Sequence, residues 1–248
     1  MKLKRIFAAV LAAAMLLSFA GCANKDTQGG SSEPAGEQTT EERTTEPQTN
    51  EDGSLVKPKN AVSVSDDVKI KTYSGTSLIE IGNRVMEPYG NAYKNMKAYA
   101  DALNRLKAEM PNTKAYCLMA PTAIEFYAPS KYNTGVSKSQ YEGMCYIYEQ
   151  LKDITPVNAY AEMAAHTDEY LYFRSDHHWT TLGAYYAYRT FAKVAGFTPV
   201  DKNTLQTGKL SPFLGLFYKD TKSTALSNDP DYVEYFIPPV NTTAIASD

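Results

Sequence analysis

The sequence predicts an α/β fold over residues 61–240, with amphipathic helices packed around a mainly parallel sheet. Three observations lead to this prediction. Short β-rich runs alternate along the chain with apolar residues at helical spacing. One of these runs, 115–120, is apolar almost throughout, as expected of a strand covered on both faces. The stretch is long enough for one domain and hardly for two.

The first half of this domain is expected to hold two strands and two helices. The first helix carries apolar residues at helical spacing and ends before Pro111. The second helix begins at a capping box, in which Ser139 precedes Glu142 by three residues, and its apolar stripe reaches Leu151. The expected elements are a strand at 77–81, a helix at 93–110, a strand at 115–120 and the helix that starts at Ser139.

The most regular element of the second half is a helix that Thr180 or Thr181 caps and Gly196 ends. Beyond Gly196 the pattern weakens, so residues 220–231 are expected to form turns, and the tail at 241–248 carries no structural signal. The other expected elements are a strand at 155–160, a short helix at 161–165, a β-like run at 170–174, an apolar run at 213–218 and a final edge strand at 232–236.

The first 22 residues have the pattern of an export signal. Basic residues at the start precede the apolar run 6–20, which is too short to be a stable transmembrane helix. The run ends in Phe-Ala-Gly-Cys and there resembles a bacterial lipoprotein signal, which implies that Cys22 receives the lipid and becomes the first residue of the mature protein. Ordinary secretion, with Cys22 removed or spare, is the alternative.

Residues 23–60 are rich in Ser, Thr, Glu, Gln, Gly and Pro, without apolar periodicity. Such a segment cannot bury enough surface to offset its ordering entropy, so we expect a disordered acidic linker. Together with the signal, this predicts an extracytoplasmic protein held at the cell membrane by a lipid. The net charge of −3 and the lack of a basic cluster argue against nucleic-acid binding. Cys117 and Cys145 are expected to be buried free thiols, although an exported site also permits a disulfide.

The residues best suited to catalysis lie just before the 180–196 helix. Asp176 precedes His178 by two positions, and on an extended or turn segment such positions face the same way. The carboxylate then orients one ring nitrogen, while the other takes a proton from a hydroxyl. A local hydrogen bond without catalytic role is the alternative. His177 and Trp179 are candidates for substrate binding, with backbone hydrogen bonding and loop packing as their respective alternatives.

A metal site is the competing interpretation of the same residues. Asp176, His177 and His178 are all competent ligands, but three consecutive residues rarely converge on one ion. His166 lies about ten residues upstream, and the chain has no Cys-x-x-Cys motif. We therefore expect neither a metal ion nor another cofactor.

The stretch 170–188, which contains Asp-His-His-Trp, closely resembles the bacterial DHHW protein family. This family is similar to the SGNH-hydrolase-like proteins of alginate O-acetylation, which have an Asp-x-His-Trp motif. Further similar segments, which extend the likeness over most of 78–238, are Ala120-Pro-Thr122 with Phe126-Tyr127, Ser139-Gln140, Phe213-Leu-Gly215 with Tyr218, and Asp229-Pro-Asp231 before Tyr235.

The resemblance implies a Rossmann-like three-layer α/β/α sandwich of the SGNH-hydrolase type. It also implies chemistry on acyl esters, notably acetyl esters, of cell-surface polysaccharide, with Asp176 as the acid of a catalytic triad and His178 as its base. The implied partners are the polysaccharide and a membrane-bound O-acyltransferase.

The chain departs from the family pattern in one respect. The family has a downstream block with Asp-Ser that supplies the nucleophile, and this sequence ends at Asp248 before such a block. We therefore expect a fold that is incomplete at its C-terminal end and lacks the serine. Two functional hypotheses follow, an esterase or O-acetyltransferase completed by another serine and an inactive module that binds glycan or an acyltransferase; an incomplete gene product is a third possibility. The late serines fit the role poorly: Ser211, Ser223, Ser227 and Ser247.

Overall fold

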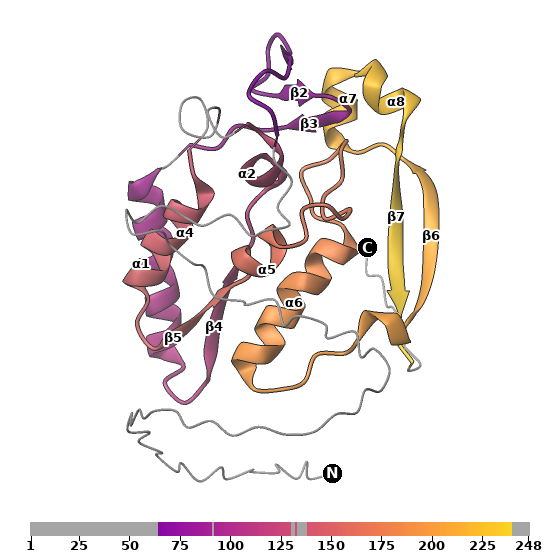
Figure 1. The fold of residues 1–248 in the computed structure, drawn as a ribbon. Helices are drawn as coiled ribbons and strands as arrows, with labels where there is room; N and C mark the ends of the chain where they lie inside the picture. Colours follow the sequence, from indigo (N-terminus) through magenta and orange to yellow (C-terminus); the bar gives the residue numbers. More distant parts are fainter. Residues whose placement is uncertain (1–63, 91, 130–131, 133–137, 240–248) are drawn as a thin grey trace, which may run out of the picture. The chain divides into compact units, whose positions relative to one another are not determined.

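A computed structural model describes residues 64–90, 92–129, 132 and 138–239 (Figure 1). All of them belong to one compact unit, Glu42–Asp248. The expected signal at 1–22, the linker at 23–60 and the tail at 241–248 lie outside the described residues. Within these residues, no helix combines the length and the apolar character that crossing a membrane requires.

Helices cover both faces of a short parallel sheet in the middle of the fold (Figure 1). The two strands pair in register from Ala115 opposite Ile154 to Met119 opposite Asn158. One pair of helices lies on one face and a second pair on the other. The elements of these layers are β4 (Ala115–Met119) and β5 (Ile154–Asn158), then α1 (Tyr93–Glu109) and α4 (Gln140–Gln150), then α5 (Tyr160–Ala164) and α6 (Thr181–Ala195).

The side chains of β4 explain the three layers, because neighbours on a strand face opposite sides. Tyr116 packs edge to face on Phe191 of α6, with ring centroids 5.4 Å apart. Met119 points the other way and packs against the cluster that holds Met96 of α1 and Ile147 of α4. The expected three-layer α/β/α sandwich is therefore confirmed.

The expected helix caps are also present. The Ser139 hydroxyl accepts a hydrogen bond from the amide of Glu142 at 3.3 Å and so begins α4. Thr180 caps α6 by accepting from the amide of Gly183, whereas the Thr181 hydroxyl donates to the carbonyl of Glu234. α6 ends at Gly196, whose φ of 85° lies in the left-handed region that favours glycine.

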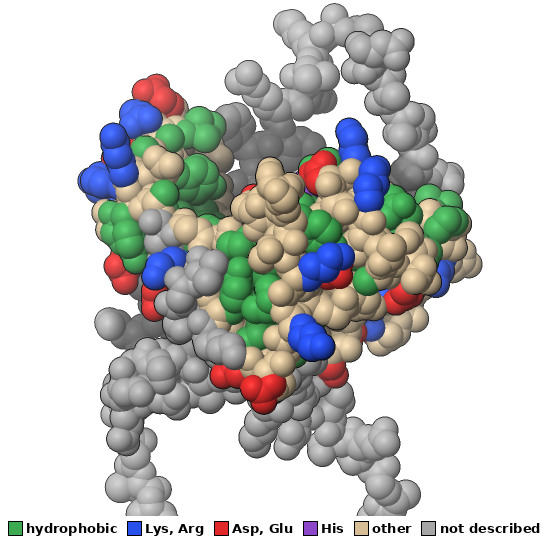
Figure 2. Space-filling model, turned by 90° about the horizontal axis from the view of Figure 1, so that it is seen from above, with side chains coloured by type: hydrophobic (Ala, Val, Ile, Leu, Met, Phe, Trp, Pro, Cys, Tyr) green, Lys and Arg blue, Asp and Glu red, His purple; other side chains and the backbone are tan. Residues whose placement is uncertain are grey.

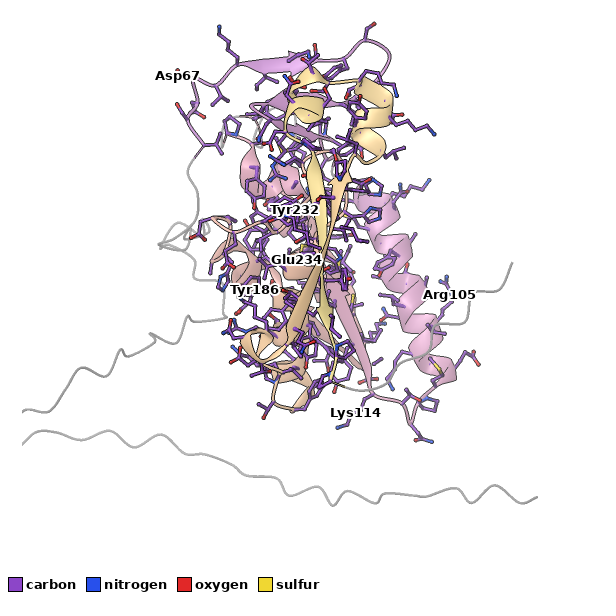
Figure 3. All side chains as sticks on the ribbon, turned by 90° about the vertical axis from the view of Figure 1, so that its right-hand side faces the viewer. Asp67, Arg105, Lys114, Tyr186, Tyr232 and Glu234 are labelled. Atoms are coloured by element: carbon purple, nitrogen blue, oxygen red, sulfur yellow. The ribbon has the colours of Figure 1, made fainter. Side chains whose placement is uncertain are left out.

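Outside the parallel pair, the described strands pair antiparallel, which differs from the expected mainly parallel sheet. A three-stranded sheet precedes α1, and a two-stranded ribbon near the end lies beside α6 (Figure 1). Figure 3, in which Tyr232 and Glu234 are labelled, shows this ribbon from the side. Only β2 and β7 of these strands correspond to sequence expectations. The strands are β1 (Ile70–Thr72), β2 (Ile79–Ile81) and β3 (Arg84–Met86), and β6 (Gln206–Phe213) with β7 (Asp231–Ile237).

The expectation of turns over 220–231 is wrong, because short helices occupy part of this segment. Ser223 caps one helix by accepting from the amide of Leu226. The Leu226 and Phe217 side chains are buried in one cluster with Leu78 and with Val85 of β3. Tertiary burial thus stabilises helices too short to show a periodicity. The short elements not yet named are α2 (Ala123–Tyr127), the 3-10 turn η1 (Lys202–Thr204), α7 (Leu216–Thr221) and α8 (Thr224–Asn228).

The main core lies between β2, β3, α2, α5 and α6, and Tyr172 and Tyr186 are its largest fully buried side chains. Cys117 is a buried free thiol, as expected, and Cys145 is also free but only half-buried. On the face shown in Figure 2, side chains of Lys and Arg are interspersed with those of Asp and Glu around hydrophobic patches.

Candidate functional site

The loop that carries Asp-His-His-Trp is closed at its base and fixed to the start of α6. Instead of the expected β-like run over 170–174, a single bridge pairs Tyr172 with Trp179. The Thr180 amide donates to the Leu171 carbonyl at 2.8 Å, and the Phe173 amide donates to the His178 carbonyl at 3.3 Å. These two hydrogen bonds join the two ends of the loop that runs from Phe173 to His178.

Beneath the loop, the carboxylate of Asp231 anchors the residues that precede Asp176. Asp231 is 1% exposed and accepts from the Ser175 amide at 2.7 Å and the Ser175 hydroxyl at 2.5 Å. It also accepts from Nε of Arg174 at 3.0 Å and from the Tyr170 hydroxyl at 2.5 Å. Burial opposes the charge, but these hydrogen bonds together hold the pKa of Asp231 below its usual value.

This role of Asp231 was not predicted. The sequence contained a signal, because Asp229-Pro-Asp231 is among the segments that resemble the DHHW family. Its function depends on a contact across 56 positions of the chain, from Asp231 to Ser175, which local pattern cannot supply.

Asp176 is fixed by donors on both of its oxygens. Oδ2 accepts from the amide of Leu216 at 3.0 Å, and Oδ1 accepts from the amide of His178 at 3.0 Å. Gly215 allows this approach, since a Cβ there would lie 2.4 Å from the Cβ of Asp176. Burial favours the neutral acid, but the hydrogen bonds from Leu216 and His178 outweigh it and lower the pKa of Asp176. The carboxylate is therefore ionised at neutral pH.

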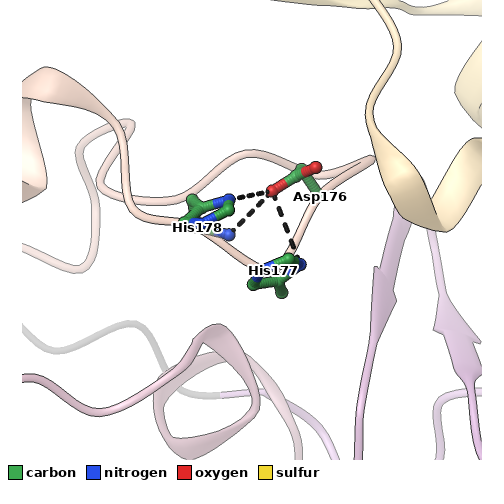
Figure 4. Close-up of side chains that lie close together, drawn as sticks. All are labelled: Asp176, His177 and His178. Carbon is green, nitrogen blue, oxygen red and sulfur yellow. Dashed lines mark hydrogen bonds and ion pairs between the residues drawn. The ribbon is translucent and has the colours of Figure 1, made fainter.

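The ring of His178 rests on this carboxylate and faces solvent. Its Nδ1 lies 2.6 Å from Oδ1 of Asp176, while 65% of the side chain is exposed (Figure 4). Among the described residues, none forms a hydrogen bond with its Nε2. The structure thus brings Asp176 and His178 together in the geometry of an oriented base, as expected from their spacing, and their catalytic roles stay a prediction.

His177 contacts the ring of His178 and also lines a pocket. Its ring centroid is 3.9 Å from that of His178, and its side chain is 43% exposed. The pocket has a volume of about 290 Å³ and lies between β3, α2 and α7. The lining is mainly apolar, and its residues are Met86, Glu87, Pro88, Tyr89, Gly90, Thr122, Ala123, Ile124, His177 and Phe217.

Trp179 is placed differently from His177. It is half-buried against the main core and forms the bridge with Tyr172, so its contacts are those of a packing residue. It does not line the pocket described above. Its substrate-binding role stays a prediction.

The described serines near the loop are engaged elsewhere. Ser175 is fully buried, and its hydroxyl donates to Asp231. The Ser223 hydroxyl is also buried and contacts Glu80. In the part of the chain that the structure describes, no serine or threonine hydroxyl is hydrogen-bonded to the ring of His178.

The three consecutive side chains do converge, contrary to the sequence-based expectation. One ligand atom from each of Asp176, His177 and His178 lies within 4.8 Å of the other two. Adjacent residues reach this arrangement because the loop turns at Asp176 and both imidazoles fold toward its Oδ1 (Figure 4).

Comparisons with known proteins place this geometry in context. A family model described as "DHHW protein" matches residues 47–247. A crystal structure of a DHHW family protein from Eubacterium siraeum is 31% identical, with a TM-score of 0.63, over 69% of this chain and 57% of that chain. No curated protein matches.

Two further solved structures are more distant. Bacillus cereus PatB1 with a sulfonyl adduct is 16% identical, with a TM-score of 0.49, over 69% of this chain and 58% of that chain. The O-acetyltransferase domain of Pseudomonas putida AlgJ is 15% identical, with a TM-score of 0.44, over 69% of this chain and 66% of that chain. The chain thus spans less than two thirds of each of these three solved chains.

Proposed function

The chain belongs to the DHHW protein family, and we propose that it acts on acyl esters, notably acetyl esters, of a cell-surface polysaccharide. The observation that carries the proposal is the contact of 2.6 Å between Nδ1 of His178 and the fixed carboxylate of Asp176. The Asp-x-His-Trp motif, similar to that of the SGNH-hydrolase-like proteins of alginate O-acetylation, supports the choice of ester chemistry.

In this proposal, His178 is the general base. Asp176 accepts a hydrogen bond from Nδ1–H and stays ionised, so the lone pair on Nε2 is free to take a proton from a hydroxyl. The hydroxyl oxygen attacks the acyl carbonyl, and the imidazolium that forms is stabilised by Asp176. Collapse of the tetrahedral intermediate returns the proton to the leaving oxygen. The hydroxyl belongs to a serine of the protein, to the acceptor sugar in transfer or to water in hydrolysis, and water also releases the acyl group from an acylated serine.

The pocket beside His177 supports an uncharged acyl group as the bound part of the substrate. Met86, Ile124 and Phe217 make its walls apolar, and Glu87, the only carboxylate among the described residues that line it, disfavours an anion. His177 lines this pocket, and the centroid of its ring is 3.9 Å from that of His178, the proposed base.

The proposed setting is the outer face of the cell membrane. Cys22 would carry the lipid, and residues 23–60 would hold the domain away from the bilayer, within reach of polysaccharide and of a membrane-bound O-acyltransferase.

The second candidate function is an inactive module that holds glycan or the acyltransferase through the same pocket. It is favoured by the absence, among the described residues, of a hydroxyl bonded to His178. In that case the dyad would act only as a polar contact for the ligand.

The test is hydrolysis of p-nitrophenyl acetate and deacetylation of an O-acetylated polysaccharide by the purified chain. We expect Asp176→Asn and His178→Ala to lower kcat about 10³-fold or more. Asp220→Asn is the matched control, because Asp220 is exposed and lies outside the site. Activity that survives His178→Ala contradicts the proposal. Glycan binding without turnover in any variant supports the inactive module instead.

A further inference from the structure

Three metal-ligating groups converge on the solvent-facing side of the loop. Oδ1 of Asp176 lies 2.6 Å from Nδ1 of His178 and 3.7 Å from Nδ1 of His177 (Figure 4). In a tetrahedral zinc site, ligand bonds of about 2.0–2.2 Å put neighbouring ligand atoms roughly 3.4 Å apart. The first observed distance is shorter than this ligand–ligand separation and the second is longer. Small rotations of the two imidazoles would therefore bring both nitrogens to the separation that a zinc site requires.

We propose that Asp176, His177 and His178 bind a divalent transition metal ion of the zinc type, and that the ion switches the Asp–His dyad off. Metal binding goes beyond the proposed function, because it requires no ester chemistry, whereas the inhibitory effect rests on His178 being the proposed base.

Two of the three ligands have room to turn, and the third is held in place. The two imidazoles are 43% and 65% exposed and so have room to turn, whereas Asp176 is held by the amides of Leu216 and His178. Two histidines and one carboxylate form the ligand set of open zinc sites, in which water or substrate takes the fourth position. Imidazole nitrogen also selects zinc, copper and nickel over magnesium and calcium.

The local charge favours a cation as well. Among the described residues, Asp176 forms no ion pair with Lys or Arg, whereas the buried Asp231 is paired with Arg174. The negative charge of Asp176 is therefore available to interact with the two imidazoles and with a bound cation.

Binding at Nδ1 of His178 has a direct chemical consequence. The metal displaces the Nδ1 proton, so the remaining proton of the neutral ring resides on Nε2. Nε2 is then a donor and no longer accepts a proton from a hydroxyl. The hydrogen bond between His178 and Asp176 is replaced by the metal at the same time. A bound ion would thus inhibit the base, and a chelator would restore it.

The test is calorimetric titration of the chelator-treated chain with ZnCl₂, and with MgCl₂ for comparison. We expect one zinc ion per chain with a micromolar or lower Kd, and no detectable magnesium binding. His177→Ala, which leaves the Asp176–His178 hydrogen bond in place, should weaken zinc binding at least about tenfold, as should His178→Ala. Asp220→Asn, the exposed control, should bind zinc as the unaltered chain does.

A second readout checks the location and the consequence. In ¹H–¹⁵N spectra of the histidine rings, zinc should move the proton of His178 from Nδ1 to Nε2. Zinc binding that is as tight in His177→Ala and His178→Ala as in the unaltered chain, or that is absent below about 1 mM, overturns the proposal. Neither experiment measures turnover, so a failed ester assay leaves this test intact, and a failed zinc titration leaves the ester proposal standing.

Discussion

The fold contains two pairs of histidine and carboxylate with the same separation and opposite surroundings. Nδ1 of His166 lies 2.6 Å from Glu169, and Nδ1 of His178 lies 2.6 Å from Asp176. The side chain of His166 is 10% exposed and that of His178 is 65% exposed.

The first pair is built into the core. The ring of His166 stacks on Tyr186, with centroids 3.7 Å apart, and its Nε2 lies 3.9 Å from the buried carboxylate of Glu162. Glu169 also accepts from the Tyr186 hydroxyl at 2.7 Å. This pair joins α5 to α6. The comparison teaches that a short His–carboxylate contact does not itself mark a functional site; what distinguishes His178 is that its second nitrogen faces solvent.

Stability should separate the two histidines most clearly. His166→Ala removes a buried, stacked ring and two carboxylate contacts, and we expect it to lower the free energy of unfolding by about 3 kcal/mol. His178→Ala should change it by less than about 0.5 kcal/mol, because the ring is exposed. Urea denaturation of both variants measures the difference. Equal losses would mean that His178 is also a structural residue.

The anchor under the exposed pair should have the next largest effect. Asp231→Asn weakens the charged hydrogen bonds to Ser175 and Arg174, and we expect a loss of about 2 kcal/mol. Asp220→Asn, an exposed aspartate changed in the same way, should be within about 0.5 kcal/mol of the unaltered chain. If Asp231→Asn matches that control, the loop is held by its other contacts.

Acidification should expose a property that the two pairs share. Both carboxylates have a lowered pKa. Burial raises the pKa of Glu169, but the hydrogen bonds with Tyr186 and His166 lower it further than burial raises it. The hydrogen bonds from Leu216 and His178 outweigh burial in the same way at Asp176. A depressed pKa contributes stability above the unfolded value, and this is lost as pH falls through the folded value. Glu169→Gln and Asp176→Asn should each flatten the decline of stability below about pH 4.5. The free energy of unfolding is measured by denaturation at a series of pH values. If it declines at acid pH in both variants as it does in the unaltered chain, the assigned hydrogen bonds are contradicted.

The mildest perturbation is chemical modification. Diethyl pyrocarbonate reacts with accessible neutral imidazole, so His177 and His178 should be modified first and His166 only after unfolding. Mass spectrometry of peptides over time gives the order, with little expected change in stability. Early modification of His166 would mean that its pair opens readily in the native state.

Sequence reasoning recovered the elements whose signals are local. The i, i+2 spacing brought Asp176 to His178, and the cap at Thr180 with Gly196 fixed the limits of α6. It missed features that depend on contacts distant in sequence. Asp231 holds the loop by its hydrogen bonds with Ser175. The α8 helix is stabilised because Leu226 is buried against residues that are distant in the sequence.

The pair of His166 and Glu169 was missed for a related reason. Spacing of three residues is common on exposed helices, and only burial against Tyr186 gives the pair a structural role. The convergence of His177 with its neighbours was also unexpected, because it depends on how the loop turns at Asp176.

The account rests on Asp176 holding His178 with its proton on Nδ1 and its Nε2 open. The most direct test is the tautomer of His178 in ¹⁵N-resolved spectra at about pH 8, recorded without metal and compared with Asp176→Asn. We predict an Nδ1–H tautomer with a far-downfield proton that is lost in the variant. An Nε2–H tautomer, or a ring that averages both forms in the unaltered chain, would contradict the account.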